Sequence, residues 1–103
     1  MKVRLKAAAI IDLQGIADYG AAQWGVPRAR DFMTSLIEAI EELALRPYGG
    51  RPRSSLVEGL RSVRYRGYLI FFVLEDSHPV VVAVLSERRY LAAIDFADRV
   101  AET

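Results

Sequence analysis

Apolar and polar residues alternate at the start of the chain and then recur with a helical period. In residues 2–6, Val3 and Leu5 lie between basic side chains, which predicts a short, half-buried strand near the edge of a sheet. From residue 7 to residue 24, apolar or small side chains return at steps of three and four, as they do on one face of an amphipathic helix. These positions are Ile10, Leu13, Ile16, Ala17, Gly20 and Trp24.

A second amphipathic helix is predicted for residues 27–46. Gly25 and Pro27 mark the break before it, because glycine favours the position just past a helix end and proline the first turn of the next helix. Pro47 ends the pattern, and the glycines that follow it indicate a turn. Two helices joined by so short a break predict an antiparallel helical hairpin.

Gly15 and Gly20 are unexpected inside the first helix, where each costs about 1 kcal/mol relative to alanine. We favour the interpretation that the second helix approaches closely at these positions. The alternative is a flat helix surface that is kept open for a partner.

Three strands are predicted in the second half of the chain, after a loop over residues 47–58. They cover residues 59–66, 68–74 and 80–86, with turns at Arg66-Gly67 and at residues 75–79. The strand 68–74 is almost entirely apolar and aromatic, which is typical of a central strand that is buried on both faces. Residues 91–101 have the spacing of a short terminal helix.

The predicted fold is therefore α+β, with the order β-α-α-β-β-β and a terminal helix, in a single domain over residues 1–103. The last three strands form an antiparallel meander, and the helical hairpin packs on one face of this small antiparallel sheet. The opposite face is expected to be partly bare, and therefore open to a ligand, a nucleic acid or a partner segment.

The composition limits the chemistry of this domain. With 103 residues, of which 52% are hydrophobic, the chain is large enough for one core and too apolar to be disordered. It contains no cysteine, which excludes disulfide scaffolds, thiol catalysis and cysteine-ligated zinc, and its single histidine, His78, excludes a histidine-cluster metal site. No glycine-rich phosphate loop and no carboxylate pair stands out. We therefore expect no metal and no cofactor.

The sequence shows no signal peptide and no membrane span, since no apolar run approaches about 18 residues. The expected location is the cytoplasm, without a membrane partner.

The net charge of +1 hides an uneven distribution along the chain. Residues 1–50 are neutral, residues 51–70 carry five arginines against one glutamate, and residues 71–103 carry a net charge of −3. Twelve of the 14 basic residues are arginine. A guanidinium group is a planar, permanent cation that suits carboxylates and phosphates, although a genome biased toward arginine explains the same count.

Arginines of the predicted meander are the remaining candidates for chemistry. Arg61, Arg64 and Arg66 belong to the strand 59–66, and Arg88, Arg89 and Tyr90 follow the strand 80–86. If these strands are neighbours, the guanidinium groups gather near one end of the sheet, where they would bind phosphate, and Tyr90 would stack on a base. The alternative is that the arginines pair at the surface with Glu58, Glu75 and Glu87.

Taken in order, the motifs resemble the ParE/RelE superfamily of toxins from type II toxin–antitoxin systems, and within it the ParE-like branch. The resemblance covers nearly the whole chain and rests on Leu13-x-x-Ile16-x-x-Tyr19, Trp24-Gly25, Leu43-Ala44-x-x-Pro47, Gly49-Gly50-Arg51, Gly59-Leu60-Arg61, Tyr68-Leu69-Ile70-Phe71-Phe72 and Val84-Leu85-x-x-Arg88-Arg89. Ser86 and Tyr90 depart from the ParE-like pattern, which often has histidine and aspartate there, and the Arg-Arg-Tyr ending is closer to the RelE branch. The two lysines and the low net charge favour the ParE-like branch, because a groove that holds mRNA should be more positive.

The resemblance implies a toxin that inhibits DNA gyrase by trapping the enzyme on cleaved DNA, which is a binding activity and requires no catalytic residue. The implied target contacts are Arg61, Arg64, Arg88, Arg89 and Tyr90. The alternative is a RelE-like, ribosome-dependent mRNA endoribonuclease, with Arg61, Arg64, Arg88 and Tyr90 as its catalytic candidates. A third hypothesis is an interaction module whose toxicity has been lost.

The resemblance also implies a partner, a ParD-like antitoxin with a ribbon-helix-helix DNA-binding end. Its toxin-binding segment would dock as a helix in a groove or as an added strand. The candidate contacts on the toxin are Leu13, Ile16, Tyr19 and Trp24, wherever they escape the core. Operator DNA would be bound only through the antitoxin complex.

Overall fold

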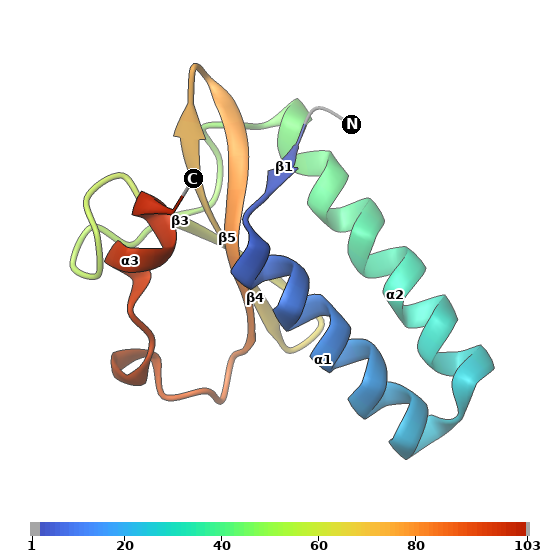
Figure 1. The fold of residues 1–103 in the computed structure, drawn as a ribbon. Helices are drawn as coiled ribbons and strands as arrows, with labels where there is room; N and C mark the ends of the chain where they lie inside the picture. Colours follow the sequence, from blue (N-terminus) through green and yellow to red (C-terminus); the bar gives the residue numbers. More distant parts are fainter. Residues whose placement is uncertain (1–2, 103) are drawn as a thin grey trace.

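A five-stranded sheet lies between the helical hairpin and the C-terminal segment (Figure 1). The computed structural model describes residues 3–102. Its strands are β1 (Arg4–Leu5), β2 (Arg51–Pro52), β3 (Arg61–Tyr65), β4 (Tyr68–Glu75) and β5 (His78–Ser86), in the spatial order β1-β5-β4-β3-β2. Neighbouring strands from β2 to β5 pair antiparallel, so the predicted meander is confirmed.

The two edge strands add detail that the sequence pattern did not contain. β1 pairs with β5 in parallel, with Arg4 opposite Val80, so the sheet is mixed at this edge. The alternation of apolar and basic residues at the start of the chain predicts an edge strand, but it does not determine whether that strand pairs parallel or antiparallel with its neighbour. β2 lies in the segment expected to be a loop, and it pairs Arg51 with Ser62 at the opposite edge. The predicted fold class, α+β with a helical hairpin on a small sheet, is confirmed.

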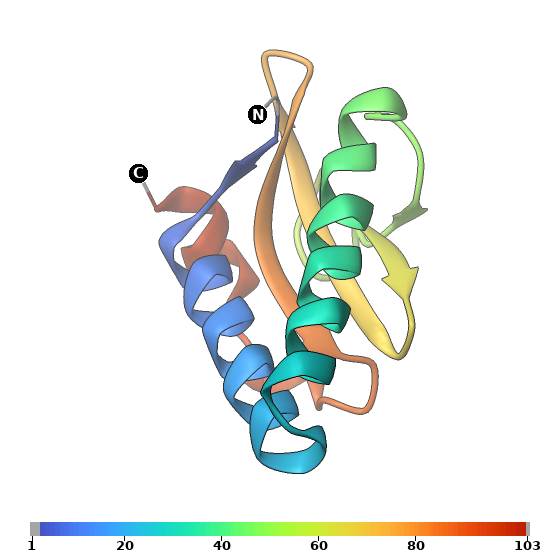
Figure 2. The ribbon, with the colours of Figure 1, turned by 90° about the vertical axis from the view of Figure 1, so that its right-hand side faces the viewer.

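The helical hairpin consists of α1 (Ala7–Trp24) and α2 (Val26–Glu41), which lie side by side over the sheet (Figure 2). Only Gly25 separates them, and its φ of +87° is a conformation that side chains rarely adopt. Its N–H donates to the Ala21 carbonyl oxygen, and its own carbonyl oxygen accepts the N–H of Ala29. One glycine therefore ends the first helix and begins the second.

The predicted second helix is shorter than expected as an α-helix. After α2, the chain tightens into a 3-10 helix, η1 (Glu42–Leu45), before Pro47. Leu43 in η1 is buried and still belongs to the apolar stripe, so the amphipathic pattern continues through η1 and only the type of the last turn differs.

The two glycines inside α1 have different surroundings. A Cβ on Gly20 would lie 3.3 Å from the Ala29 Cβ and 3.2 Å from the Trp24 ring, so the expected close approach of the second helix is confirmed there. Gly15 is exposed, and a Cβ on it would meet no described atom outside its own helix within 4 Å. The close-approach interpretation is therefore wrong for Gly15, which leaves an open helix surface.

β4 is buried on both faces, as predicted for a central strand. Ile70 and Phe72 pack toward the hairpin, whereas Phe71 and Val73 pack on the opposite side. The hairpin layer of the core is Val3, Ala9, Leu13, Leu36, Ile40, Leu43, Ile70, Phe72, Val81 and Val84. The opposite layer is Leu60, Phe71, Val73, Val80, Val82, Ala83, Leu85 and Phe96.

A β-bulge lets β5 contribute to both layers. Its pairing with β4 shifts between Phe71, which faces Ala83, and Phe72, which faces Val81. Val82 is therefore an extra residue with no partner on β4. At this point the side chains of β5 stop alternating strictly between the two faces of the sheet. As a result, the consecutive residues Val82 and Ala83 both belong to the layer opposite the hairpin.

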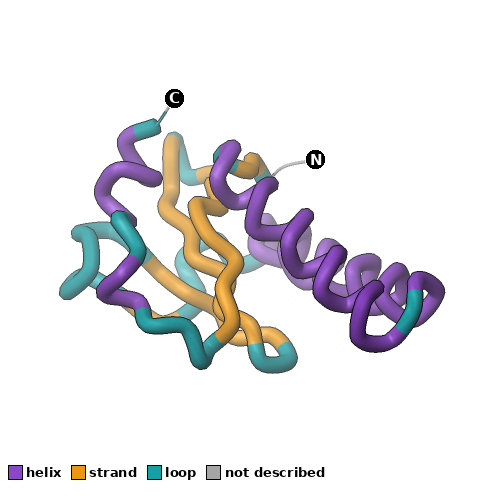
Figure 3. The backbone as a smooth tube through the Cα atoms, turned by 60° about the horizontal axis from the view of Figure 1, so that its bottom comes forward, coloured by secondary structure: helices purple, strands orange, loops and turns teal. Residues whose placement is uncertain are grey.

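The sheet face opposite the hairpin is covered, which corrects the expectation that it is partly bare. η2 (Leu91–Ala93), α3 (Phe96–Ala101) and residues 53–60 lie over it (Figures 1 and 3). The ring centroids of Phe96 and Phe71 are 4.7 Å apart. Because Leu56, Leu91 and Ile94 pack against the same apolar residues, this segment completes a second core layer in place of a docking surface.

Candidate functional site

The arginines proposed as target contacts do not form one cluster. Arg61 and Arg64 lie three positions apart on β3, where they pair with Phe72 and Leu69 of β4. Side chains alternate along a strand, so the two arginines point to opposite faces and stand about 10 Å apart along it. They cannot act together on one bound phosphate from these positions.

Arg61 holds the turn that follows η1. Its Nε donates to the Gly49 carbonyl oxygen and its Nη2 to the Tyr48 carbonyl oxygen, each at 2.8 Å. Gly50 in the same turn has a φ of +82°. Since the Nε–Nη2 edge of the guanidinium is engaged with backbone oxygens, Arg61 has a structural role at this turn and is only in part available as a free cation.

Arg64 forms a two-point ion pair with Glu87. Its Nε lies 2.7 Å from Glu87 Oε2, and its Nη2 donates to Oε1 at 3.1 Å. The expected surface pairing of an arginine with a glutamate is thus confirmed here. The Glu87 N–H donates to the Gly67 carbonyl oxygen, so the β3–β4 turn and the segment after β5 lie side by side. This end of the sheet therefore carries Arg64, the turn residue Arg66 and the segment 87–90, whereas Arg61 is farther along the strand.

Arg88, Arg89 and Tyr90 are exposed in the segment after β5. The Arg88 N–H donates to Ser86 Oγ, and the Tyr90 side chain is 76% exposed. Neither arginine forms an ion pair with a carboxylate of residues 3–102. Of the proposed target contacts, these three are the ones most available to another molecule.

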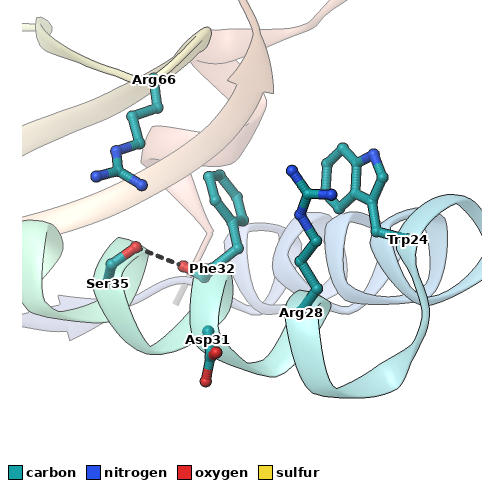
Figure 4. A pocket seen from close by; sticks show the side chains of 6 residues that line it. All are labelled: Trp24, Arg28, Asp31, Phe32, Ser35 and Arg66. Atoms are coloured by element: carbon teal, nitrogen blue, oxygen red, sulfur yellow. Dashed lines mark hydrogen bonds between the residues drawn. The ribbon is translucent and has the colours of Figure 1, made fainter.

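A pocket of about 320 Å³ lies between the tip of the hairpin and the β3–β4 turn. We name it the tip pocket, and it is lined by Trp24, Arg28, Asp31, Phe32, Ser35 and Arg66 (Figure 4). Sequence reasoning did not select Arg28 or Phe32. Arg28 lies off the apolar stripe four residues after Trp24, but this spacing becomes informative only when the hairpin brings the two side chains together, with the guanidinium carbon 6.0 Å from the indole centroid.

A row of aromatic rings connects the hairpin tip to the sheet. The ring centroids are 6.3 Å apart for Tyr19 and Trp24, 6.3 Å for Trp24 and Phe32, and 5.8 Å for Phe32 and Tyr68. Burial, and to a lesser degree the nearby Tyr19, raise the pKa of the Tyr68 phenol above its ordinary value. These ring contacts link the sheet to the part of the hairpin that extends past it (Figure 3).

A second, larger groove of about 720 Å³ runs between the end of α2 and the edge of β3. Ser35, Glu38 and Glu42 line one side, and Val63, Arg64 and Tyr65 line the other. β2 pairs only with Arg61 and Ser62, so among residues 3–102 the rest of this β3 edge has no strand beside it. An open strand edge next to a groove is a place where a segment of another chain can add a strand.

The four residues proposed for antitoxin binding are divided between core and surface. Leu13 is 7% exposed and lies in the hairpin layer of the core, and half-buried Ile16 packs against that layer. Tyr19 and Trp24 are exposed at 58% and 45%. Ile10, which the apolar spacing places on the same face as Leu13, is 43% exposed, and Ile11 and Val26 are exposed apolar residues that the sequence pattern did not single out.

Neither a metal site nor a membrane-spanning helix is found in the part of the chain that the structure describes. Within residues 3–102, no three histidine, cysteine, aspartate or glutamate side chains gather as metal ligands would. No helix in this range combines the length and the apolar content that a membrane span requires. His78 lies exposed at the start of β5, just after the β4–β5 turn, with its Nδ1 2.7 Å from the Asp76 carbonyl oxygen.

Comparison with known proteins places the chain in one family. The family described as "ParE toxin of type II toxin-antitoxin system, parDE" matches residues 3–91. Toxin ParE1 of Caulobacter vibrioides is 33% identical over 69 residues, which cover 67% of this chain and 72% of that protein. The fold is similar to that of the chromosomal ParDE TA system from P. aeruginosa, with a TM-score of 0.73 and 19% identity over 84% of this chain and 95% of that one. The resemblance inferred from the ordered motifs is confirmed, and the chain belongs to the ParE toxin family of type II toxin–antitoxin systems.

Proposed function

We propose that this chain is a growth-inhibiting toxin that binds DNA gyrase, traps the enzyme on cleaved DNA and is neutralised by a ParD-like antitoxin. Family membership supports this function. One observation favours a binding mechanism over a nuclease: Arg61 and Arg64 lie on opposite faces of β3. Arg61 already donates to backbone oxygens, and Arg64 is already paired with Glu87. A nuclease needs such groups to converge on one phosphate.

The proposed target surface is the segment after β5. Arg88, Arg89 and Tyr90 are exposed there, and two arginines beside a tyrosine suit a contact with gyrase or with the DNA it holds. Arg64 and Arg61 contribute less directly, since Arg64 is held by Glu87 and Arg61 supports the turn at Gly49. Since gyrase and its DNA are cytoplasmic, the proposed action takes place in the cytoplasm.

Gyrase inhibition is tested with purified proteins. The wild-type chain should block supercoiling and accumulate cleaved DNA. The triple variant Arg88→Ala, Arg89→Ala and Tyr90→Ala should lose roughly 10-fold or more in potency, because exposed arginines and aromatic residues carry much of the energy of such contacts. Arg30→Ala on the exposed side of α2 is the matched control and should inhibit like wild type.

Three results would contradict the proposed function. One is the absence of both inhibition and trapped cleavage complex at micromolar toxin. A second is A-site cleavage of translated mRNA, seen by primer extension after induction, which would identify the RelE-like endoribonuclease instead. A third is normal growth after induction without antitoxin, which would indicate an interaction module whose toxicity has been lost.

The proposed antitoxin surface combines the exposed apolar residues of the hairpin with the groove beside β3. Tyr19 and Trp24 would meet a helix of the antitoxin, and the open edge at Val63–Tyr65 would accept a strand. Operator DNA would be bound by the ribbon-helix-helix end of the antitoxin. Trp24→Glu should weaken binding of the cognate antitoxin in calorimetry, whereas Tyr90→Ala, which lies outside this surface, should leave it unchanged.

A further inference from the structure

Two cationic side chains reach the tip pocket from different elements. Arg28 extends from the first turn of α2 beside Trp24, and Arg66 extends from the β3–β4 turn toward Phe32 (Figure 4). The Phe32 ring stands between them, whereas the Asp31 carboxylate points away from this ring (Figure 4). The pocket therefore has two cations and one carboxylate around an aromatic wall.

Neither arginine of the tip pocket forms an ion pair with a carboxylate of residues 3–102, although Asp31 lines the same pocket. The four ion pairs among residues 3–102 use Arg4, Lys6, Arg64 and Arg99 as their cations. Arg28 and Arg66 instead lie over aromatic rings, at 6.0 Å from Trp24 and 5.6 Å from Tyr65. Two guanidinium groups held beside aromatic surface, with one carboxylate near them that is ion-paired to neither, favour the entry of an anionic group from another molecule.

The size and walls of the pocket indicate which anion fits. A volume of about 320 Å³ accommodates one or two side chains but not a nucleic-acid strand. Arg28 already lies over the Trp24 indole, and Phe32 meets that indole at an interplanar angle of 65°, so the two rings present no parallel faces between which a base could stack. Asp31, on the rim, repels a polyanion more than it repels a single carboxylate.

We propose that the tip pocket binds an acidic peptide segment of a protein partner, with a carboxylate held by Arg28 and Arg66 and a neighbouring apolar side chain placed against Phe32 and Trp24. The arrangement is that of a peptide anchor, in which an apolar side chain supplies contact area and a charge-assisted hydrogen bond supplies specificity. The proposal concerns the chemistry of the bound segment. It therefore stands or falls separately from gyrase inhibition.

The test uses a phage-displayed dodecapeptide library selected on the full chain. Enriched peptides should share aspartate or glutamate beside leucine or an aromatic residue. A synthetic peptide of that sequence should bind Arg66→Glu and Arg28→Glu about 10-fold or more weakly than wild type, since each removes a charged hydrogen-bond donor. Arg30→Glu changes the net charge equally, lies on α2 outside the pocket lining, and should bind within about 2-fold of wild type.

A second arm links the peptide to the two arginines. Changing the peptide's acidic residue to its amide should weaken binding to wild type more than binding to Arg66→Glu, where the new carboxylate already repels the acidic residue. Thermal melts show whether each variant is folded. If charge reversal unfolds the chain, Arg66→Gln and Arg28→Gln replace it in the same comparison.

Several outcomes would overturn the proposal. These are a selection that enriches no peptide or only neutral ones, equal binding of the enriched peptide by wild type and by the folded Arg66 variant, and equal weakening by Arg30→Glu. A fluorescein-labelled single-stranded oligonucleotide is the competing probe. If it binds wild type and the Arg28 and Arg66 variants abolish that binding while peptides do not bind, the pocket is a phosphate site.

Discussion

The Asp12 carboxylate and the Arg99 guanidinium form an ion pair, with Oδ2 2.7 Å from Nη1, although 87 positions separate them in the sequence. Their side chains are only 13% and 19% exposed. Asp12 also accepts the N–H of Val84 at 3.0 Å, and Arg99 donates to the Val82 carbonyl oxygen at 3.1 Å. The pair thus provides hydrogen-bond partners for the backbone of β5 beyond the end of β1, and it joins α1 and α3 to the sheet.

We expect Asp12→Ala to lower the free energy of unfolding by about 2–3 kcal/mol, because Arg99 would keep its charge in a mostly buried place and Val84 would lose its hydrogen-bond acceptor. Urea denaturation measures this change. Glu87→Ala, which breaks the more exposed pair with Arg64, is the matched control and should cost less than about 1 kcal/mol. Equal losses in the two variants would show that the Asp12 pair has no special role.

The two glycines of α1 should respond in opposite ways to alanine. Gly15→Ala should raise the free energy of unfolding by about 1 kcal/mol, because its surroundings are open and alanine is the better helix former. Gly20→Ala gains the same propensity but places a Cβ against Ala29 and Trp24, so it should be neutral or destabilising. Chemical denaturation of both variants checks the contrast, and a stabilised Gly20→Ala would mean that the helices do not approach closely there.

Gly50→Ala should destabilise the chain more than Gly59→Ala. Both glycines have positive φ values, +82° and +84°, so both substitutions carry backbone strain of about 1 kcal/mol or more. At Gly50 the new Cβ would also lie 2.7 Å from the Ser62 carbonyl oxygen, which would disturb the pairing of β2 with β3, whereas the space at Gly59 is open. Thermal denaturation ranks the two, and a lower melting temperature for Gly59→Ala would contradict the geometry around Gly50.

Tyr68 should make the chain sensitive to alkaline pH. Burial and Tyr19 raise the pKa of this phenol in the folded state, so its neutral form is favoured by folding. Its stabilising contribution is complete below the unfolded pKa of about 10 and is lost as pH rises through the higher folded pKa, because the unfolded chain releases the proton first. Tyr68→Phe should therefore lose less stability than wild type between about pH 9 and pH 11.

Urea denaturation at several pH values measures the effect of Tyr68. Tyr90→Phe removes a hydroxyl from a side chain that is 76% exposed, and it serves as the control that should follow the wild-type curve. If Tyr68→Phe follows that curve as well, the phenol is not linked to folding.

The sequence by itself determined the local elements of this protein. The apolar spacing of residues 7–24, the break at Gly25 and Pro27, and the apolar run of β4 each depend on backbone conformations within a few residues. The helical hairpin and the meander were therefore predictable, as were the family resemblance and the turn between β4 and β5, although β5 already begins at His78.

Only the tertiary structure decided which distant residues meet. The parallel direction of β1, the bulge at Val82, the cover that α3 places on the second face, and the pairing of Asp12 with Arg99 depend on packing between segments far apart in the sequence. The same holds for the candidate sites: alternation separates Arg61 from Arg64, whereas the hairpin and the β3–β4 turn bring Arg28 and Arg66 to one pocket. The spacing of apolar residues shows which face of its own helix or strand a side chain occupies. Only the folded chain determines which other residues that face contacts.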